Sequence, residues 1–204
     1  MSDNPLSQDT SASLVDRAKA IIVRPKEEWP RIAAEPTSQN DVLLRYALPL
    51  IAIGPICGLI GGQVFGYGGM GFHLRPSLGF SVGTAIASFV MGVIGLFLIS
   101  FIANLLAPRF GGREDWLRAF KLVTYSMTPA WLVGVFSLIP MLGILAILGL
   151  YSFYLFYLGS SRMLSVPEDQ AGGYTAVTII VGIVVFIVLG LISTALVGGP
   201  ANFL

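Results

Sequence analysis

The stretch Leu122–Ser161, LVTYSMTPAWLVGVFSLIPMLGILAILGLYSFYLFYLGSS, decides the fold class of this chain. Its forty residues include no Asp, Glu, Lys or Arg. A helix needs about 20 apolar residues to cross about 30 Å of hydrocarbon, so the stretch is long enough to cross a bilayer twice. Near its middle, the sequence IPMLG at Ile139–Gly143 combines a proline that lacks a backbone donor with a glycine that permits a turn. We therefore predict two spans, at about 120–138 and 142–161, joined as a hairpin.

Further stretches without charged residues continue this pattern on both sides. They lie between Tyr46 and Leu74, between Pro76 and Pro108, and from Gln170 to Leu204. Each can hold one span, and we place these spans at about 46–66, 78–106 and 174–197. The composition agrees, because 55% of the 204 residues are hydrophobic and only 11% are charged, whereas a soluble domain carries about a quarter charged residues. The predicted fold is an all-α integral membrane protein, with a five-helix transmembrane bundle at residues 46–197.

The few charged residues predict how the bundle is oriented. With the N-terminus in the cytoplasm, eleven of the twelve Lys and Arg residues lie on the cytoplasmic side, and only Arg75 lies outside. This is a strong positive-inside bias. Residues 198–204 are then a non-cytoplasmic C-terminal tail, on the periplasmic or extracellular side.

The N-terminal region divides into a polar tail at residues 1–12, predicted to be disordered, and a cytoplasmic amphipathic or interfacial segment at 13–45. Ser13 followed by Asp16 resembles a helix N-cap, and Arg17 is assigned to the polar face of the short helix that follows. The sequence RPKEEW then starts a second short helix, with Trp29 as an interfacial anchor. Such helices either cap a bundle or dock a partner, and both interpretations stay open.

Small residues recur at helical spacing in the first two predicted spans, where they let backbones approach closely in lipid. These candidate helix-packing residues are Gly54, Gly58, Gly62 and Gly66 in the first span, and Gly79, Gly83 and Ala87 in the second. We expect the first face to pack on the second. Packing against a second copy of the chain is the alternative.

A second group of residues is expected to face the bundle interior. Pro129 leaves a carbonyl free about one turn earlier, near Tyr125, and Ser126 or Thr128 can satisfy it. Trp131 lies too deep for an interfacial belt, so its indole N–H needs a buried acceptor. The candidate interior residues are Asn104, Tyr125, Ser126, Thr128, Pro129 and Trp131.

Catalytic chemistry has little support in the sequence. One His and one Cys cannot build a metal site of nitrogen and sulfur ligands, and no carboxylate lies within a predicted span. The sequence around Ser81 matches G-x-S-x-G, but the sole histidine, His73, lies in the preceding loop. We predict that the chain is not an enzyme and has no catalytic residue, cofactor or metal site.

Two motifs, YSMTPAWL at Tyr125–Leu132 and IPMLG at Ile139–Gly143, resemble the Yip-domain family of five-span membrane proteins related to Ypt/Rab-interacting proteins. The resemblance covers about residues 40–197, and the preceding RPKEEW is similar to the compact bacterial branch. It implies a bacterial inner (plasma) membrane location, with Tyr125, Pro129, Pro140 and Gly143 as structural landmarks. In place of the long cytoplasmic N-terminal domain with its acidic segment that eukaryotic members have, about 45 residues with a basic amphipathic start precede the first span, so Rab binding is not carried over.

Together these features favour a non-enzymatic membrane adaptor or scaffold of the Yip-like type, acting through helix packing and its cytoplasmic face. A small transporter or channel subunit, with a path between proline-interrupted spans, is the alternative. The lipid bilayer is an expected partner. A membrane or cytoplasmic protein partner and a homo-oligomer stay open, while a net charge of +1 gives no sign of nucleic-acid binding.

Overall fold

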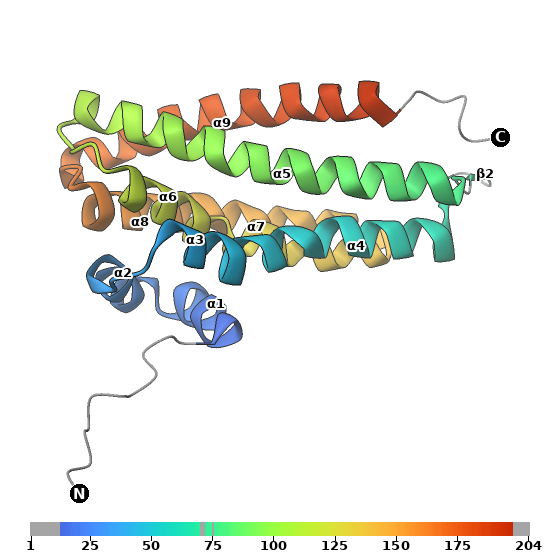
Figure 1. Cartoon of the computed structure of the whole chain (residues 1–204), viewed down its shortest axis with the longest axis horizontal. Helices are drawn as coiled ribbons and strands as arrows, with labels where there is room; N and C mark the ends of the chain where they lie inside the picture. The colour runs from blue at the N-terminus through green and yellow to red at the C-terminus, as the bar shows by residue number, and fades with distance from the viewer. Residues whose placement is uncertain (1–12, 70–71, 75, 198–204) are drawn as a thin grey trace, which may run out of the picture.

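The computed structural model describes residues 13–69, 72–74 and 76–197. The predicted tails at 1–12 and 198–204 lie outside this part of the chain. The elements form one elongated helical bundle with a two-stranded ribbon at one end (Figure 1). In chain order they are α1 (Leu14–Val23), α2 (Pro25–Ala34), α3 (Gln39–Val42), the π-helix η1 (Leu43–Ala47), α4 (Leu48–Phe65), β1 (Tyr67–Gly69), β2 (Phe72–Leu74), α5 (Leu78–Leu106), the 3₁₀-helix η2 (Ala107–Phe110), α6 (Trp116–Ser126), α7 (Thr128–Leu132), the 3₁₀-helices η3 (Val133–Leu138) and η4 (Pro140–Leu150), α8 (Tyr151–Leu164) and α9 (Glu168–Val197).

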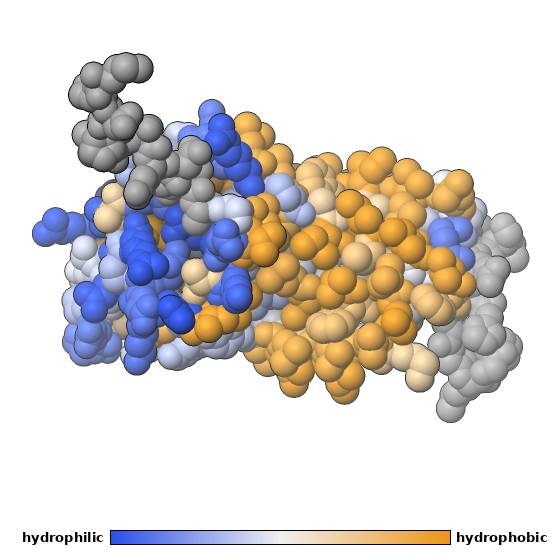
Figure 2. All heavy atoms as spheres, turned by 90° about the horizontal axis from the view of Figure 1, so that it is seen from below, coloured by the Kyte–Doolittle hydropathy of each residue, from blue (hydrophilic) through white to orange (hydrophobic). Residues whose placement is uncertain are grey.

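Several helical stretches are long and apolar enough to cross a membrane, which makes the chain an integral membrane protein. Four qualify among the described residues: Gln39–Phe65, Leu78–Phe110, Met141–Leu164 and Glu168–Leu196. Figure 2 shows the apolar surface that they present beside a hydrophilic end of the molecule. We call that end the polar end.

The predicted span at 120–138 is not among these four, because it is not one continuous helix. Its residues form the end of α6, then α7 and η3. The break falls beside Pro129, which lacks the N–H that a continuous helix would need. The broken segment nevertheless runs along η1 and α4: Thr128 bonds to Tyr46 of η1, and the backbone of Leu138 packs on Gly61 near the end of α4.

The predicted hairpin in the middle of the long uncharged stretch is present. Its turn lies between η3 and η4, around Ile139. The Ile139 N–H donates to the Phe136 carbonyl (3.1 Å), and the Leu142 N–H donates to the Ile139 carbonyl (2.8 Å). These two short-range bonds satisfy backbone groups where Pro140 has no donor to offer.

The expected pairing of the two small-residue faces is wrong. Gly54 packs against Gly134 of η3, where a Cβ on Gly134 would lie 2.8 Å from the Gly54 Cα, and Gly58 faces Ser137. By contrast, Gly79 has no atom of another element within 4 Å of its ideal Cβ position. Gly83 and Ala87 line a shallow groove on the same side of α5. A small face allows close approach but does not select the partner, and the glycine face of α4 approaches η3, while other residues of α4 pack on α5.

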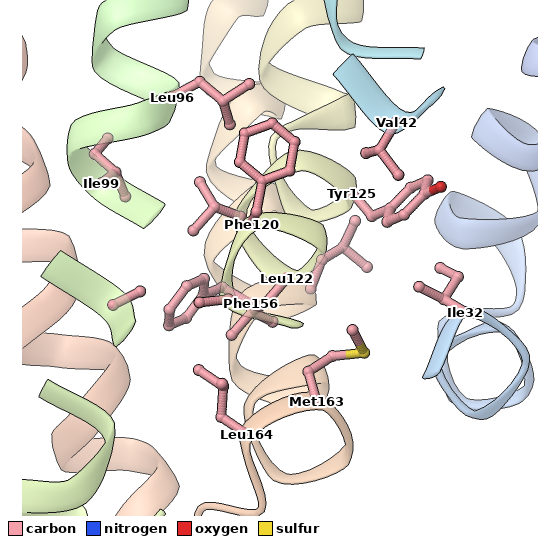
Figure 3. Close-up of a cluster of buried hydrophobic side chains, with 14 of the residues drawn as sticks. Ile32, Val42, Leu96, Ile99, Phe120, Leu122, Tyr125, Phe156, Met163 and Leu164 are labelled. Carbon is pink, nitrogen blue, oxygen red and sulfur yellow. The ribbon is translucent and has the colours of Figure 1, made fainter. Parts of the chain in front are cut away.

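The buried hydrophobic core is concentrated toward the polar end. Figure 3 shows Phe120 and Leu122 of α6 lying among Leu96 of α5 and Phe156 and Met163 of α8. Many apolar side chains farther along α5 and α9 are exposed on the surface of the bundle. That surface suits lipid, because hydrocarbon does not penalise exposed apolar side chains.

Candidate functional site

The candidate site is the polar end of the bundle, where α1 and α2 fold back beneath the spanning helices (Figure 1). We call these two helices, Leu14–Ala34, the polar cap. The first begins with the predicted N-cap: the Asp16 N–H donates to Ser13 Oγ at 3.2 Å. The second begins with Pro25 in its first turn, followed by Glu27 and Glu28 near the positive end of the helix dipole.

A buried ion network holds the polar cap together. The Arg17 guanidinium pairs with the carboxylates of Glu28 and Glu35, and Arg17 and Glu28 are only 7% and 3% exposed. The Lys121 ammonium of α6 donates to the backbone carbonyl of Glu35 at 2.7 Å. Buried charges are tolerated only when they are paired in this way. The assignment of Arg17 to the solvent-facing side of the helix was therefore wrong.

Trp29 fastens the polar cap to α8 and α6. Its side chain is 1% exposed and lies against Gly159 and Leu122. Nearby, the Tyr151 hydroxyl donates to the Ile22 carbonyl at 3.0 Å. The predicted role of Trp29 as an interfacial anchor is wrong, because the indole is enclosed by protein where the cap meets the bundle.

Above the polar cap, hydrogen-bonded hydroxyl groups connect η1 to the broken helix. The Tyr46 and Thr128 hydroxyls lie 2.7 Å apart, and Thr128 Oγ1 also donates to the Tyr125 carbonyl at 2.8 Å. The aromatic rings of Tyr46 and Tyr125 pack with their centroids 4.7 Å apart. Thr128 is thus the residue that satisfies the carbonyl left free by Pro129.

The other expected interior residues lie at separate places in the structure. Asn104 accepts a hydrogen bond from the Asp115 N–H at 2.9 Å, which fixes the loop before α6. Pro129 is buried, and Trp131 is partly buried and packs against the core. Ser126 is buried, and its hydroxyl has no hydrogen-bond partner.

Ser126 lines a cavity of about 340 Å³ between α5, α6, α7, η3, η4, α8 and α9. The wall is mostly apolar, and no charged residue contributes to it. Two other hydroxyls in the wall are already used: Ser152 accepts from the Ala130 N–H, and Thr178 donates to the Tyr174 carbonyl. The chemistry of this cavity suits hydrocarbon rather than a polar solute.

Comparison with known protein families identifies the family to which this architecture belongs. The Yip1 domain matches residues 19–189. The chain belongs to the Yip1 domain family. No curated protein and no solved structure matches the chain.

The Yip1 domain match begins within α1 and ends within α9, so it includes most of the polar cap as well as the spans. The cap is therefore part of the family's domain in this chain. Within its described residues, this Yip1 domain has no cluster of three or more His, Cys, Asp or Glu side chains that could hold a metal ion. Ser81 accepts a hydrogen bond from the Gln63 amide at 2.7 Å, and the side chain of His73 lies outside the described residues.

Sequence reasoning missed the ion network and the role of Trp29. A signal for Arg17 was available, because it lies three residues after Leu14 and four before Ile21, on the apolar face. The same holds for Glu28, four residues before the buried Ile32. A charge on the apolar face of each of two consecutive short helices indicates a buried pair.

Proposed function

We propose that this Yip1 domain protein is a non-enzymatic membrane adaptor or scaffold that uses its polar cap to dock a protein partner. The observation that carries the proposal is an exposed stripe on α1, directed away from the bundle. Val15, Lys19 and Val23 recur every four residues and are exposed, Val15 and Val23 at 69% and 63%. Spacing of four places them on one helical face.

The buried side of the polar cap explains why this stripe can act as a rigid surface. Arg17, Ile21 and Trp29 are enclosed by protein, so α1 and α2 cannot rotate without breaking buried ion pairs. A preordered surface loses less conformational entropy on binding than a flexible segment does.

The remaining features of the proposal concern the membrane. We place the polar end in the cytoplasm of a bacterial cell, with the opposite end of α9 at the periplasmic or extracellular side of the inner membrane. The distribution of Lys and Arg supports this orientation. The membrane domain at 46–197 would then carry an interfacial segment at 13–45. The small-residue face of Gly79, Gly83 and Ala87 is available for a second copy of the chain.

A transporter or channel subunit is supported less well. Of the candidate interior residues, only Ser126 lines the apolar cavity between α5, α8 and α9, whereas Thr128 and Asn104 are hydrogen-bonded elsewhere. The cavity wall is apolar, which does not stabilise an ion or a polar solute.

Site-specific photo-crosslinking in cells tests the adaptor proposal. A photoreactive residue at Val15 or Val23 should give the same discrete protein adduct, while one at Ile187, an exposed apolar position on α9, should react with lipid. With the photoreactive residue at Lys19, which is exposed on the same stripe, the paired substitution Val15→Asp and Val23→Asp should abolish the adduct without lowering the thermal stability of the purified protein. Adducts only to lipid at all of these positions would refute the proposal.

Labelling of introduced cysteines tests the orientation. In a Cys57→Ser background, Lys19→Cys should react with a membrane-impermeant maleimide only after the cells are opened. Leu196→Cys, an exposed position near the end of α9, should react in cells whose outer membrane is permeabilised. The opposite pattern would invert the proposed topology.

A further inference from the structure

A second cavity lies at the polar end, outside the features used above. Its volume is about 400 Å³, and it is formed by α2, the C-terminal part of α8 and the first residue of α9. We call it the α2–α8 groove. Its lining residues are Lys26, Trp29, Tyr157, Leu158, Ser161, Arg162 and Glu168.

The groove carries an excess of positive charge. Lys26 and Arg162 are both exposed, and neither forms an ion pair within the described part of the chain. Glu168 is the one carboxylate in the lining. Two cations against one anion leave the groove attractive to a negatively charged group.

A buried donor in the same wall also lacks a partner. The Nε1 of Trp29 is buried and has no hydrogen-bond partner, although the ring itself is held firmly against Gly159 and Leu122. A buried N–H without an acceptor destabilises the folded protein. Because Trp29 lines the groove, an acceptor bound there can remove this cost.

We propose that the α2–α8 groove binds a phosphate group, with the headgroup of an anionic phospholipid as its source. An ammonium, a guanidinium, the Ser161 hydroxyl and an indole N–H are all donors, and phosphate oxygens accept from each of them. Arginine in particular matches the geometry of phosphate.

The position of the groove favours a lipid over a soluble phosphate. It lies at the polar end of α8, one of the membrane-spanning stretches. Tyr154 and Tyr157 on that helix are exposed beside it, as aromatic residues are at the level of lipid headgroups. Basic pockets between helices at this level are suited to anionic headgroups.

Binding of short-chain phosphatidylglycerol to the full-length protein, in nanodiscs of phosphatidylcholine, tests this proposal by native mass spectrometry. The double variant Lys26→Gln and Arg162→Gln should bind the lipid at least about tenfold more weakly, since it removes both charge-assisted hydrogen bonds to the phosphate. The matched control is Arg109→Gln with Arg113→Gln. It removes two exposed cations elsewhere at the polar end and should change the affinity less than about twofold.

Two single variants separate recognition from simple loss of structure. Glu168→Gln removes the competing carboxylate and should strengthen binding, which a merely damaged fold would not do. Trp29→Phe keeps a ring but removes the unpaired N–H, and it should weaken binding while the circular dichroism spectrum stays unchanged.

Inorganic phosphate and glycerol 3-phosphate, added alone, identify the source of the phosphate. If the lipid binds and these do not, the occupant is a headgroup. If phosphate alone binds as tightly and is lost in the Lys26 and Arg162 variant, the groove takes a soluble phosphate, and the lipid assignment is overturned. Equal losses in the groove and control variants, or no binding of any probe, would overturn the site itself.

Discussion

The hydroxyl groups of Tyr46 and Thr128 lie 2.7 Å apart, although 82 positions separate the two residues in the chain. Thr128 donates to the Tyr125 carbonyl, so the Tyr46 hydroxyl is the donor to Thr128. Pro129 has no N–H to offer that carbonyl. The pair therefore allows the helix to break inside the protein while the backbone at the break stays satisfied.

We expect Thr128→Val to lower the free energy of unfolding by about 1–3 kcal/mol, because it strands both the Tyr125 carbonyl and the Tyr46 hydroxyl. Tyr46→Phe should cost less, about 0.5–1.5 kcal/mol, because Thr128 keeps its own bond to Tyr125. Denaturant unfolding in mild detergent measures both. Thr194→Val is the matched control, since its hydroxyl also donates to a carbonyl three residues earlier but is exposed. Equal losses at Thr128 and Thr194 would contradict this account.

The ion network predicts a large cost for losing its central cation. Arg17→Met should destabilise the polar cap by about 3–5 kcal/mol, because Glu28 is left charged and buried. Limited proteolysis at residues 35–38, between α2 and α3, reports detachment of the cap and should become much faster.

Arg31 offers a control for that variant, because it approaches the same Glu28 carboxylate from outside. Its nitrogen lies 3.5 Å from the carboxylate oxygen, and its side chain is 70% exposed. Arg31→Met should cost no more than about 1 kcal/mol. Adding Glu28→Gln to Arg17→Met should restore part of the loss, and a double variant worse than the sum of its parts would refute the pairing.

Gly159→Ala should disturb the packing of the Trp29 indole against α8. A Cβ at this position would lie 2.6 Å from two ring atoms of Trp29 and from the Leu122 side chain, so the indole has to move. Its fluorescence should shift to longer wavelength as water reaches the ring, measured in a Trp116→Phe, Trp131→Phe background. Gly172→Ala, a helical glycine with open space around it, should leave the spectrum unchanged.

Gly61→Ala should disturb the packing of α4 on the hairpin. The added Cβ would lie 2.6 Å from the backbone oxygen of Leu138, and a backbone atom cannot turn aside as a side chain can. We expect a loss of about 1–3 kcal/mol, as for other overpacked sites, measured by thermal unfolding in detergent. Gly79→Ala has open space and should be neutral; a comparable loss there would mean that a second copy covers that face.

The sequence was informative wherever one local rule decides the structure. The absence of charge located the apolar stretches, Ser13 predicted its N-cap, and Pro140 predicted the hairpin. It was less informative at Pro129, because proline indicates a break without saying how the chain continues. Here the chain continues in the short helices α7 and η3, which the spacing of apolar residues in the sequence does not predict.

The candidate site was harder to predict because it depends on which helices meet. Trp29 at the edge of a membrane protein is usually interfacial, and only the position of α8 shows that Gly159 makes room for it. Likewise, the glycines at Gly54 and Gly58 indicate close packing, but the identity of the partner depends on the path of η3.

The packing of Trp29 against Gly159 also constrains the order in which the protein folds during synthesis. The ribosome completes α1 and α2 first, and the glycine that receives the indole follows 130 residues later, on the order of ten seconds at usual rates of synthesis. During that interval the glycine that the indole of Trp29 packs against is not yet present. Docking of the cap on α8 is thus a late event in biogenesis.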